Sequence, residues 1–119
     1  MADEQMRLVN AQDQANQYTR QIDQAMASGS PDEMRQHIEE AMAFGQNALD
    51  HLDGALSMTE DPDVADRVEE AMHHLGLSMD QGDQALDASE DEIEDFISEM
   101  RRHAQQSTLY LSEAMAVVV

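Results

Sequence analysis

The 119-residue sequence contains no cysteine, tryptophan or lysine, and only two phenylalanines, two tyrosines and two prolines. The absence of cysteine excludes disulfides, thiolate metal sites and cysteine redox chemistry, and it leaves the cellular compartment open. No apolar run approaches the length of a membrane span, and the opening MADEQMRLVN lacks the basic and apolar regions of a secretory signal. We therefore expect a soluble protein, which is periplasmic if a signal peptide was removed and otherwise cytoplasmic.

Positive charge is also scarce, since six arginines stand against 26 acidic residues and the formal net charge is -20. Such a charge repels nucleic-acid phosphates and anionic membrane surfaces and attracts cations. We expect no nucleic-acid partner and no membrane insertion. Most of the carboxylates are expected to lie on solvated helix faces.

Ten methionines and many alanines and leucines supply the apolar volume instead, a mixture that packs better between helices than in sheets. Three turn signals divide the apolar periodicity into predicted helices at about residues 3–28, 31–58, 62–87 and 90–117. Because short connections make neighbouring helices antiparallel, we predict a single all-α domain folded as an up-down-up-down antiparallel four-helix bundle. Gly45 and Gly82 lie on the expected inner faces, where they would let helix backbones approach closely.

Each turn signal combines the end of one helix with the start of the next. Two of them place a proline at the first helical position, where its missing N–H costs nothing. We expect side-chain caps at Ser30 and Asp61. Glu33 and Glu92 predict capping boxes with the serines three residues before them.

Part of the sequence repeats. A shift of 30 residues aligns Glu-Glu-Ala-Met at 39–42 with the same four residues at 69–72, so the second and third predicted helices look duplicated. The alanine and phenylalanine that follow the first copy are replaced by His73 and His74 after the second. The histidine pair is therefore not needed to complete the repeat.

Five histidines carry the sharpest functional signal. Residues at positions i and i+4 share a helix face, so a glutamate one turn before a histidine can present a carboxylate oxygen beside the imidazole to one divalent cation. His51 follows Asn47 at that spacing, whereas the other four histidines form the pairs Glu33–His37, Glu69–His73, Glu70–His74 and Glu99–His103.

Antiparallel packing predicts which pairs can meet. If the last two helices fold back about residue 89, His74 lies level with His103, and Glu70 and Glu99 lie one turn away. Two imidazoles with one or two carboxylates would suit copper, nickel or zinc. A ferritin-like di-iron centre needs two Glu-x-x-His motifs, and only the motif ending at His73 fits, so iron is less favoured.

The remaining histidines predict weaker sites. His37 and His51 recur with Phe44 and Met58 every seven residues along one side of the second helix, a pattern that also suits a contact surface for another subunit or a protein partner. The sequence carries no nucleophile elbow, phosphate loop, zinc-protease motif or EF-hand loop, and we expect no enzyme activity. The full set of candidate metal ligands is His74, His103, Glu70, Glu99, His73, Glu69, His37 and His51.

The region from Ile22 to about His103 resembles the small metal-binding protein family, through Ala25-Met26-Ala27-Ser28-Gly29, His37-Ile38-Glu39-Glu40-Ala41-Met42-Ala43 and Val68-Glu69-Glu70-Ala71-Met72-His73-His74. The resemblance implies a typically periplasmic, histidine-rich four-helix bundle that binds divalent metals such as copper, nickel and zinc without catalysis. His37, His73, His74 and His103 match family histidines, whereas Ser28 and Phe44 stand where the family favours histidine. The alternative is a structural or protein-interaction bundle, either natural and acid-adapted or designed, with no metal role.

Overall fold

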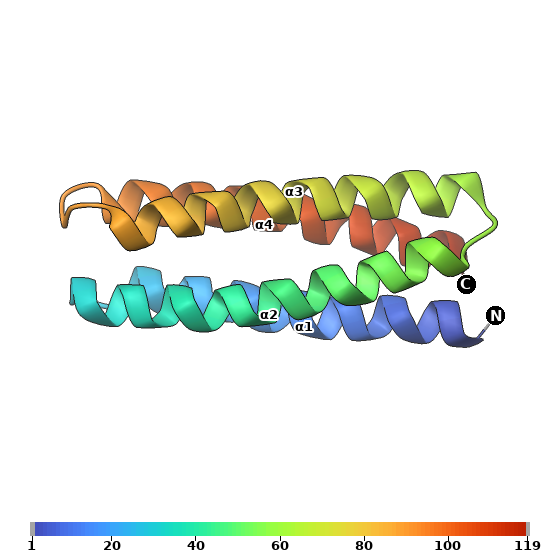
Figure 1. The fold of residues 1–119 in the computed structure, drawn as a ribbon, viewed down its shortest axis with the longest axis horizontal. Helices are drawn as coiled ribbons and strands as arrows, with labels where there is room; N and C mark the ends of the chain where they lie inside the picture. Colours follow the sequence, from blue (N-terminus) through green and yellow to red (C-terminus); the bar gives the residue numbers. More distant parts are fainter. Residues whose placement is uncertain (1, 119) are drawn as a thin grey trace.

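The computed structural model describes residues 2–118, which fold into four helices and contain no strand. The helices are α1 (Ala2–Ala27), α2 (Pro31–Met58), α3 (Pro62–Asp87) and α4 (Ile93–Val118). They run alternately up and down a rod of 46 × 18 × 18 Å, and the start of α1 and the end of α4 lie at the same end as the α2–α3 connection (Figure 1). The predicted all-α antiparallel bundle is confirmed. None of the described helices is long and apolar enough to cross a membrane.

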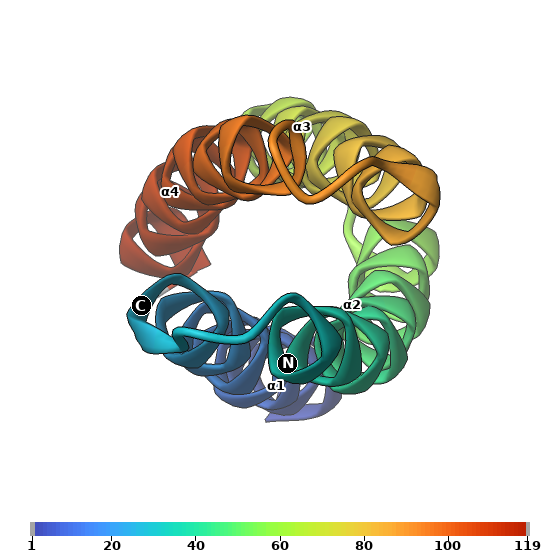
Figure 2. The same ribbon diagram turned by 90° about the vertical axis from the view of Figure 1, so that its left-hand side faces the viewer.

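Viewed along the rod, the four helices form a ring in which each helix lies beside the next in the sequence and α4 returns beside α1 (Figure 2). The most extensive packing is within two hairpins, α1 with α2 and α3 with α4. Packing between the hairpins, of α1 with α4 and α2 with α3, is less extensive. The bundle therefore consists of two helical hairpins packed against each other.

The two hairpins bury equivalent positions. An offset of 60 residues carries the buried residues of α1 onto those of α3, as with Leu8 and Val68. An offset of 59 residues carries those of α2 onto those of α4, as with Ile38 and Ile97. Successive helices match in the same way, as with Leu8, Ile38, Val68 and Ile97, so the burial pattern repeats with each helix and the two hairpins are equivalent.

The helix starts differ in how they are capped. Asp61 accepts a hydrogen bond from the backbone N–H of Asp63 at 2.9 Å, as predicted. Ser30 stands before α2, but its side chain makes no capping bond. The predicted capping box there is wrong, because Glu33 instead accepts a hydrogen bond from the hydroxyl of Ser28 at 2.9 Å.

The last helix begins at Ile93, three residues later than predicted. The backbone N–H groups of Glu92 and Ile93 both donate to the carbonyl oxygen of Ser89, at 3.1 and 3.0 Å. Residues 90–92 therefore form a tight turn, in which a bond between residues three apart takes the place of the α-helical pattern. The sequence predicted the turn but assigned its residues to the helix.

Two buried serines link the helices. Ser78 donates to the carbonyl oxygen of Met100 and Ser107 donates to that of Ala71, each at 2.7 Å. The hydroxyl of Ser78 also lies 2.6 Å from that of Tyr18. Since the Ser78 hydrogen goes to Met100, Tyr18 is the donor, and burial raises the pKa of Tyr18 well above its ordinary value. The two bonds between serines and carbonyl oxygens fix the position of α3 along the axis of α4.

The space beside Gly45 and Gly82 is filled by side chains, whereas the sequence predicted close approach of backbones. A Cβ atom on Gly45 would lie 2.9 Å from Sδ of Met79, and one on Gly82 would lie 2.8 Å from Sδ of Met42. Methionine sulfur atoms therefore occupy the space beside both glycines, and the ring of Tyr18, with two carbons at 3.0 Å, shares the space beside Gly45.

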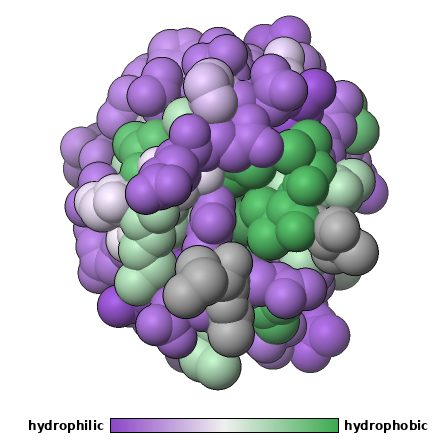
Figure 3. Space-filling model, turned by 90° about the vertical axis from the view of Figure 1, so that its right-hand side faces the viewer, coloured by the Kyte–Doolittle hydropathy of each residue, from purple (hydrophilic) through white to green (hydrophobic). Residues whose placement is uncertain are grey.

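The end of the rod with the α2–α3 connection carries a group of hydrophobic side chains within a largely hydrophilic surface (Figure 3). Exposed large apolar side chains near this end include Met6 in the first turns of α1 and Met58 at the end of α2. They line one surface hollow together with Arg7.

Candidate metal centre

His74 on α3 and His103 on α4 lie beside each other where α3 packs against α4 in the second hairpin. This partly exposed boundary between the two helices of a hairpin is called its seam. Their ring centroids are 6.4 Å apart, and their planes differ by 21°. Both side chains are half-buried, with 18% of His74 and 16% of His103 exposed. The prediction that these two residues lie level with each other is confirmed.

A tyrosine that the sequence analysis did not single out completes this cluster. The ring of Tyr110 stacks on that of His74, with centroids 5.4 Å apart and planes within 4°. Tyr110 follows His103 by two turns of α4, about 10 Å along the helix axis. The ring of His74 therefore inserts between two rings of α4, and the spacing of seven residues between His103 and Tyr110 was the sequence signal for it.

Each of the two histidines lies near the glutamate one turn before it. Oε2 of Glu70 is 3.7 Å from Nε2 of His74, and Oε2 of Glu99 is 3.9 Å from Nε2 of His103. Glu99 also accepts a hydrogen bond from Arg102 at 2.6 Å. The carboxylate of Glu99 thus contacts both the guanidinium group of Arg102 and the imidazole of His103. The salt bridge recorded for Glu70 is to His74.

The other ring nitrogens are the most informative atoms of the cluster. Among the described residues, Nδ1 of His74 and Nδ1 of His103 are buried and have no hydrogen-bond partner. A neutral imidazole carries hydrogen on one nitrogen and a lone pair on the other. With the hydrogen on Nε2, facing the glutamate, the lone pair lies on the buried Nδ1. A metal-ligating histidine likewise usually turns its second nitrogen toward a carboxylate, but here the nitrogen–oxygen distances of 3.7 and 3.9 Å are longer than a hydrogen bond.

The surroundings of His103 favour its neutral form. Burial lowers the pKa of His103, the nearby Arg102 lowers it further, and Glu99 acts in the opposite direction. The neighbouring imidazoles of His74 and His73 also lower it. His103 therefore keeps a free lone pair at a lower pH than an exposed histidine does.

The structure places the other candidate ligands apart from this pair or at its edge. His73 is exposed, with its ring edge-on to that of His74 at 5.4 Å, and Glu69 is exposed on the same helix. On α2, His37 hydrogen-bonds through Nδ1 to Gln21 at 2.9 Å, and Nδ1 of His51 lies 3.4 Å from the guanidinium group of Arg7. The last two therefore face α1 and lie on the other hairpin.

No preformed centre with many ligands exists in the described part of the chain. Among residues 2–118, no three acidic or histidine side chains are grouped so that they could hold one metal ion. What the structure brings together is a pair of imidazoles from separate helices, each with a carboxylate near its far nitrogen. Such a pair can coordinate an ion only with water or with a side chain that rotates toward it.

The first hairpin provides an internal comparison. By the offsets that relate the buried positions, Gln14 stands at the place of His74, and Phe44 at the place of His103. Asn10 and Glu40 similarly take the places of Glu70 and Glu99. The same hairpin architecture therefore forms without the histidines, which shows that this fold does not require them at the seam.

Fold and cluster together define an acidic antiparallel four-helix bundle with one histidine pair at a hairpin seam. No family model matches the sequence, and no curated protein and no solved structure matches the chain. The resemblance to the small metal-binding proteins stays a prediction, and function is argued from the cluster itself.

Proposed function

We propose that this bundle reversibly binds or buffers divalent transition metal ions, such as copper, nickel or zinc, without catalysing a reaction. His74 and His103 supply the imidazole ligands. The observation that supports this proposal is the pair of buried, unpartnered Nδ1 atoms on facing helices. Two imidazoles suit these three ions, whereas iron sites in bundles draw on converging carboxylates.

In this proposal Glu70 and Glu99 act mainly as partners of the ligands. Their oxygens lie 3.7 and 3.9 Å from Nε2, and a small side-chain rotation lets each accept a hydrogen bond from Nε2–H and so hold the lone pair on Nδ1. His73, exposed beside His74, can add a third nitrogen by side-chain rotation, and Glu69 lies on the same exposed side of α3. Water completes the coordination, so binding is expected to be weak and reversible, as a buffering role requires.

The charge of the whole chain supports the same proposal. A formal charge of -20 raises the local concentration of cations around the bundle. It selects no particular metal, because every carboxylate contributes to it. Selectivity must come from the two imidazoles.

Thermal unfolding with and without copper, nickel or zinc tests the proposal. Binding to the native state alone adds about 2.7 kcal/mol at a free metal concentration of about 100 Kd, which raises Tm by several degrees. The matched variant is His74→Gln with His103→Phe, because it installs the residues that the first hairpin carries at these places. It should fold and lose the metal-induced rise in Tm.

The control for this experiment is His37→Gln with His51→Gln, which removes two histidines from α2 and leaves the cluster intact. It should keep the metal-induced rise. If the His74→Gln, His103→Phe variant responds to metal as the parent chain does, the assignment of the ligands is wrong.

The second candidate function is that of a structural or protein-interaction bundle. The stack of His103, His74 and Tyr110 supports it, since the rings pack against one another with no ion needed. The hydrophobic group at one end of the rod would serve as the contact surface (Figure 3). This alternative predicts no change of Tm with any of the three metals, and stabilisation by molar salt that screens the acidic surface.

A further inference from the structure

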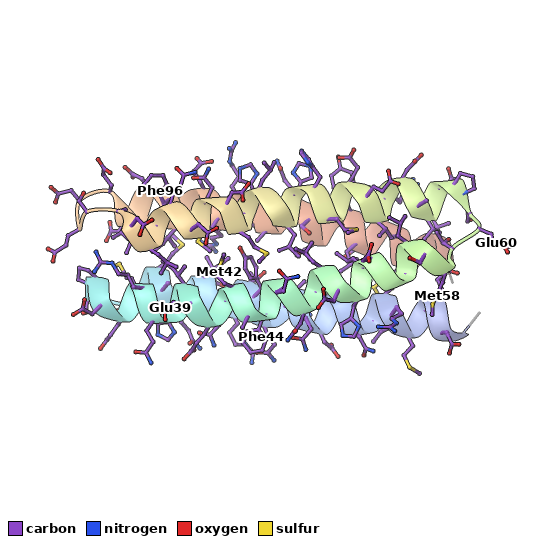
Figure 4. All side chains as sticks on the ribbon, in the orientation of Figure 1. Glu39, Met42, Phe44, Met58, Glu60 and Phe96 are labelled. Atoms are coloured by element: carbon purple, nitrogen blue, oxygen red, sulfur yellow. The ribbon has the colours of Figure 1, made fainter. Side chains whose placement is uncertain are left out.

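Methionine side chains from α2 and α3 cross each other in a reciprocal way. Met42 on α2 reaches Gly82 on α3, and Met79 on α3 reaches Gly45 on α2. Each helix therefore carries the same Met-x-x-Gly unit, and each methionine lies over the other helix's glycine, with the ring of Tyr18 sharing the space over Gly45. Figure 4 shows sulfur atoms gathered between α2 and α3 around Met42.

A third thioether comes from α4. A Cβ atom on Gly82 would lie 2.8 Å from Sδ of Met42, 2.9 Å from Cε of Met100 and 3.5 Å from Sδ of Met100. The sulfur atoms of Met42 and Met100 thus share the space over one glycine. Met79 crosses only three residues further along the paired helices, about 4.5 Å at the helical rise. Three thioethers from three helices therefore lie within about one helical turn.

The chemistry of this cluster differs from that of the histidine pair. Thioether sulfur is a soft, neutral ligand that selects copper(I) and similar ions over hard cations. Glycine inside a helix costs about 1 kcal/mol relative to alanine, and this chain places one beside each of the two crossing sulfur atoms. The long, unbranched methionine side chain can adjust around an ion without moving a helix.

Two of the three methionines of the cluster are partly exposed. Met100 is fully buried, whereas Met42 and Met79 are only partly buried at the junction of α2 and α3. The strongly acidic surface attracts a cation to this junction. We propose that Met42, Met79 and Met100 form a thioether site for a soft monovalent cation of the copper(I) or silver(I) type, separate from the histidine pair.

Silver(I) is the probe for the experiment, because it is stable in air and needs no reductant. Calorimetric titration should give one tight equivalent, and carbon-13 spectra of methyl-labelled methionines should shift for Met42, Met79 and Met100. The test variant is Met42→Leu with Met79→Leu, which keeps the core volume and should fold. It should bind silver at least tenfold more weakly.

The matched control is Met6→Leu with Met58→Leu, which removes two exposed thioethers far from the cluster and should bind silver as the parent chain does. The His74→Gln, His103→Phe variant should also retain the silver-induced methyl shifts, which separates this site from the proposed divalent site. If the leucine pair does not fold, Met79→Leu alone carries the test.

Two results would overturn the proposal. One is an unchanged affinity for silver in the Met42→Leu, Met79→Leu variant or in Met79→Leu alone. The other is a titration of the parent chain in which the methyl signals of the three methionines do not move, which would leave the cluster as packing only.

Discussion

At the scale of single residues, His103 shows how the surroundings of one side chain set its chemistry. Burial at the seam and the neighbouring Arg102 both disfavour the charged imidazole and lower the pKa of His103, while Glu99 opposes them. Metal binding requires the neutral form. The same contacts that pack His103 therefore also keep it ready to coordinate an ion under mildly acidic conditions.

The lowered pKa predicts how the metal-free protein responds to pH. The unfolded chain binds this proton first, with a pKa of about 6.5, so protonation favours unfolding. The stabilising contribution is complete above about pH 6.5 and is lost as the pH falls through the lowered pKa of folded His103. Urea unfolding between about pH 5 and about pH 7.5 measures this slope.

His103→Gln should reduce the slope, because it removes the titrating group. His37→Gln should retain it, because it leaves His103 and its neighbours unchanged. A slope in His103→Gln equal to that of the parent chain would show that other groups cause the pH dependence.

At the scale of secondary structure, local signals predicted most of the architecture. The two prolines and Asp61 act within a few residues of their own position, so they identified two helix starts correctly. The capping box at Ser30 did not form: the backbone N–H of Ser30 donates to the hydroxyl of Ser28, which itself donates to Glu33, and the pattern does not decide between the two nearby serines. The short connection between the last two helices was enough to predict that His74 and His103 lie side by side.

What the sequence could not predict depends on side-chain rotamers. The burial of both Nδ1 atoms, the stack of Tyr110 on His74 and the crossing of Met42 with Met79 each require knowing which way a side chain turns. Periodicity places a residue on a face of its helix but does not fix its torsion angles. The candidate ligands were therefore predictable, and their detailed geometry was not.

The difference between the two caps gives a prediction at this scale. Asp61→Ala removes the acceptor for the N–H of Asp63 and should lower the free energy of unfolding by about 1 kcal/mol. Ser30→Ala removes no capping bond and should change it by much less. Urea unfolding of the two variants at neutral pH compares them directly. Equal losses would mean that Ser30 caps α2 in solution.

At the scale of the whole molecule, the repeated hairpin separates what the fold needs from what a site needs. Both hairpins bury residues at matching positions, yet only the second carries the histidine pair. The seam of the first hairpin has Gln14 and Phe44 at the equivalent places, half-buried like the two histidines. The proposed ligands therefore lie between α3 and α4, and the equivalent places between α1 and α2 carry other residues.

This equivalence predicts that the proposed site for divalent metal ions can be moved to the first hairpin. Starting from the His74→Gln, His103→Phe chain, the changes Gln14→His and Phe44→His place an imidazole pair at the first seam, and Asn10→Glu supplies the missing carboxylate beside the Glu40 already present. The transplanted site should restore one equivalent of copper, nickel or zinc binding in a calorimetric titration.

Restored binding is expected to be at least as tight as in the parent chain. Arg102 occupies the carboxylate of Glu99 at 2.6 Å, whereas Ala43 stands at the equivalent place of the first hairpin and cannot compete for Glu40. The variant with Gln14→His alone is the control and should bind much more weakly, because one imidazole cannot replace two. A transplanted chain that folds and binds no metal would show that facing imidazoles with adjacent glutamates are insufficient, and would remove the physical basis of the proposed function.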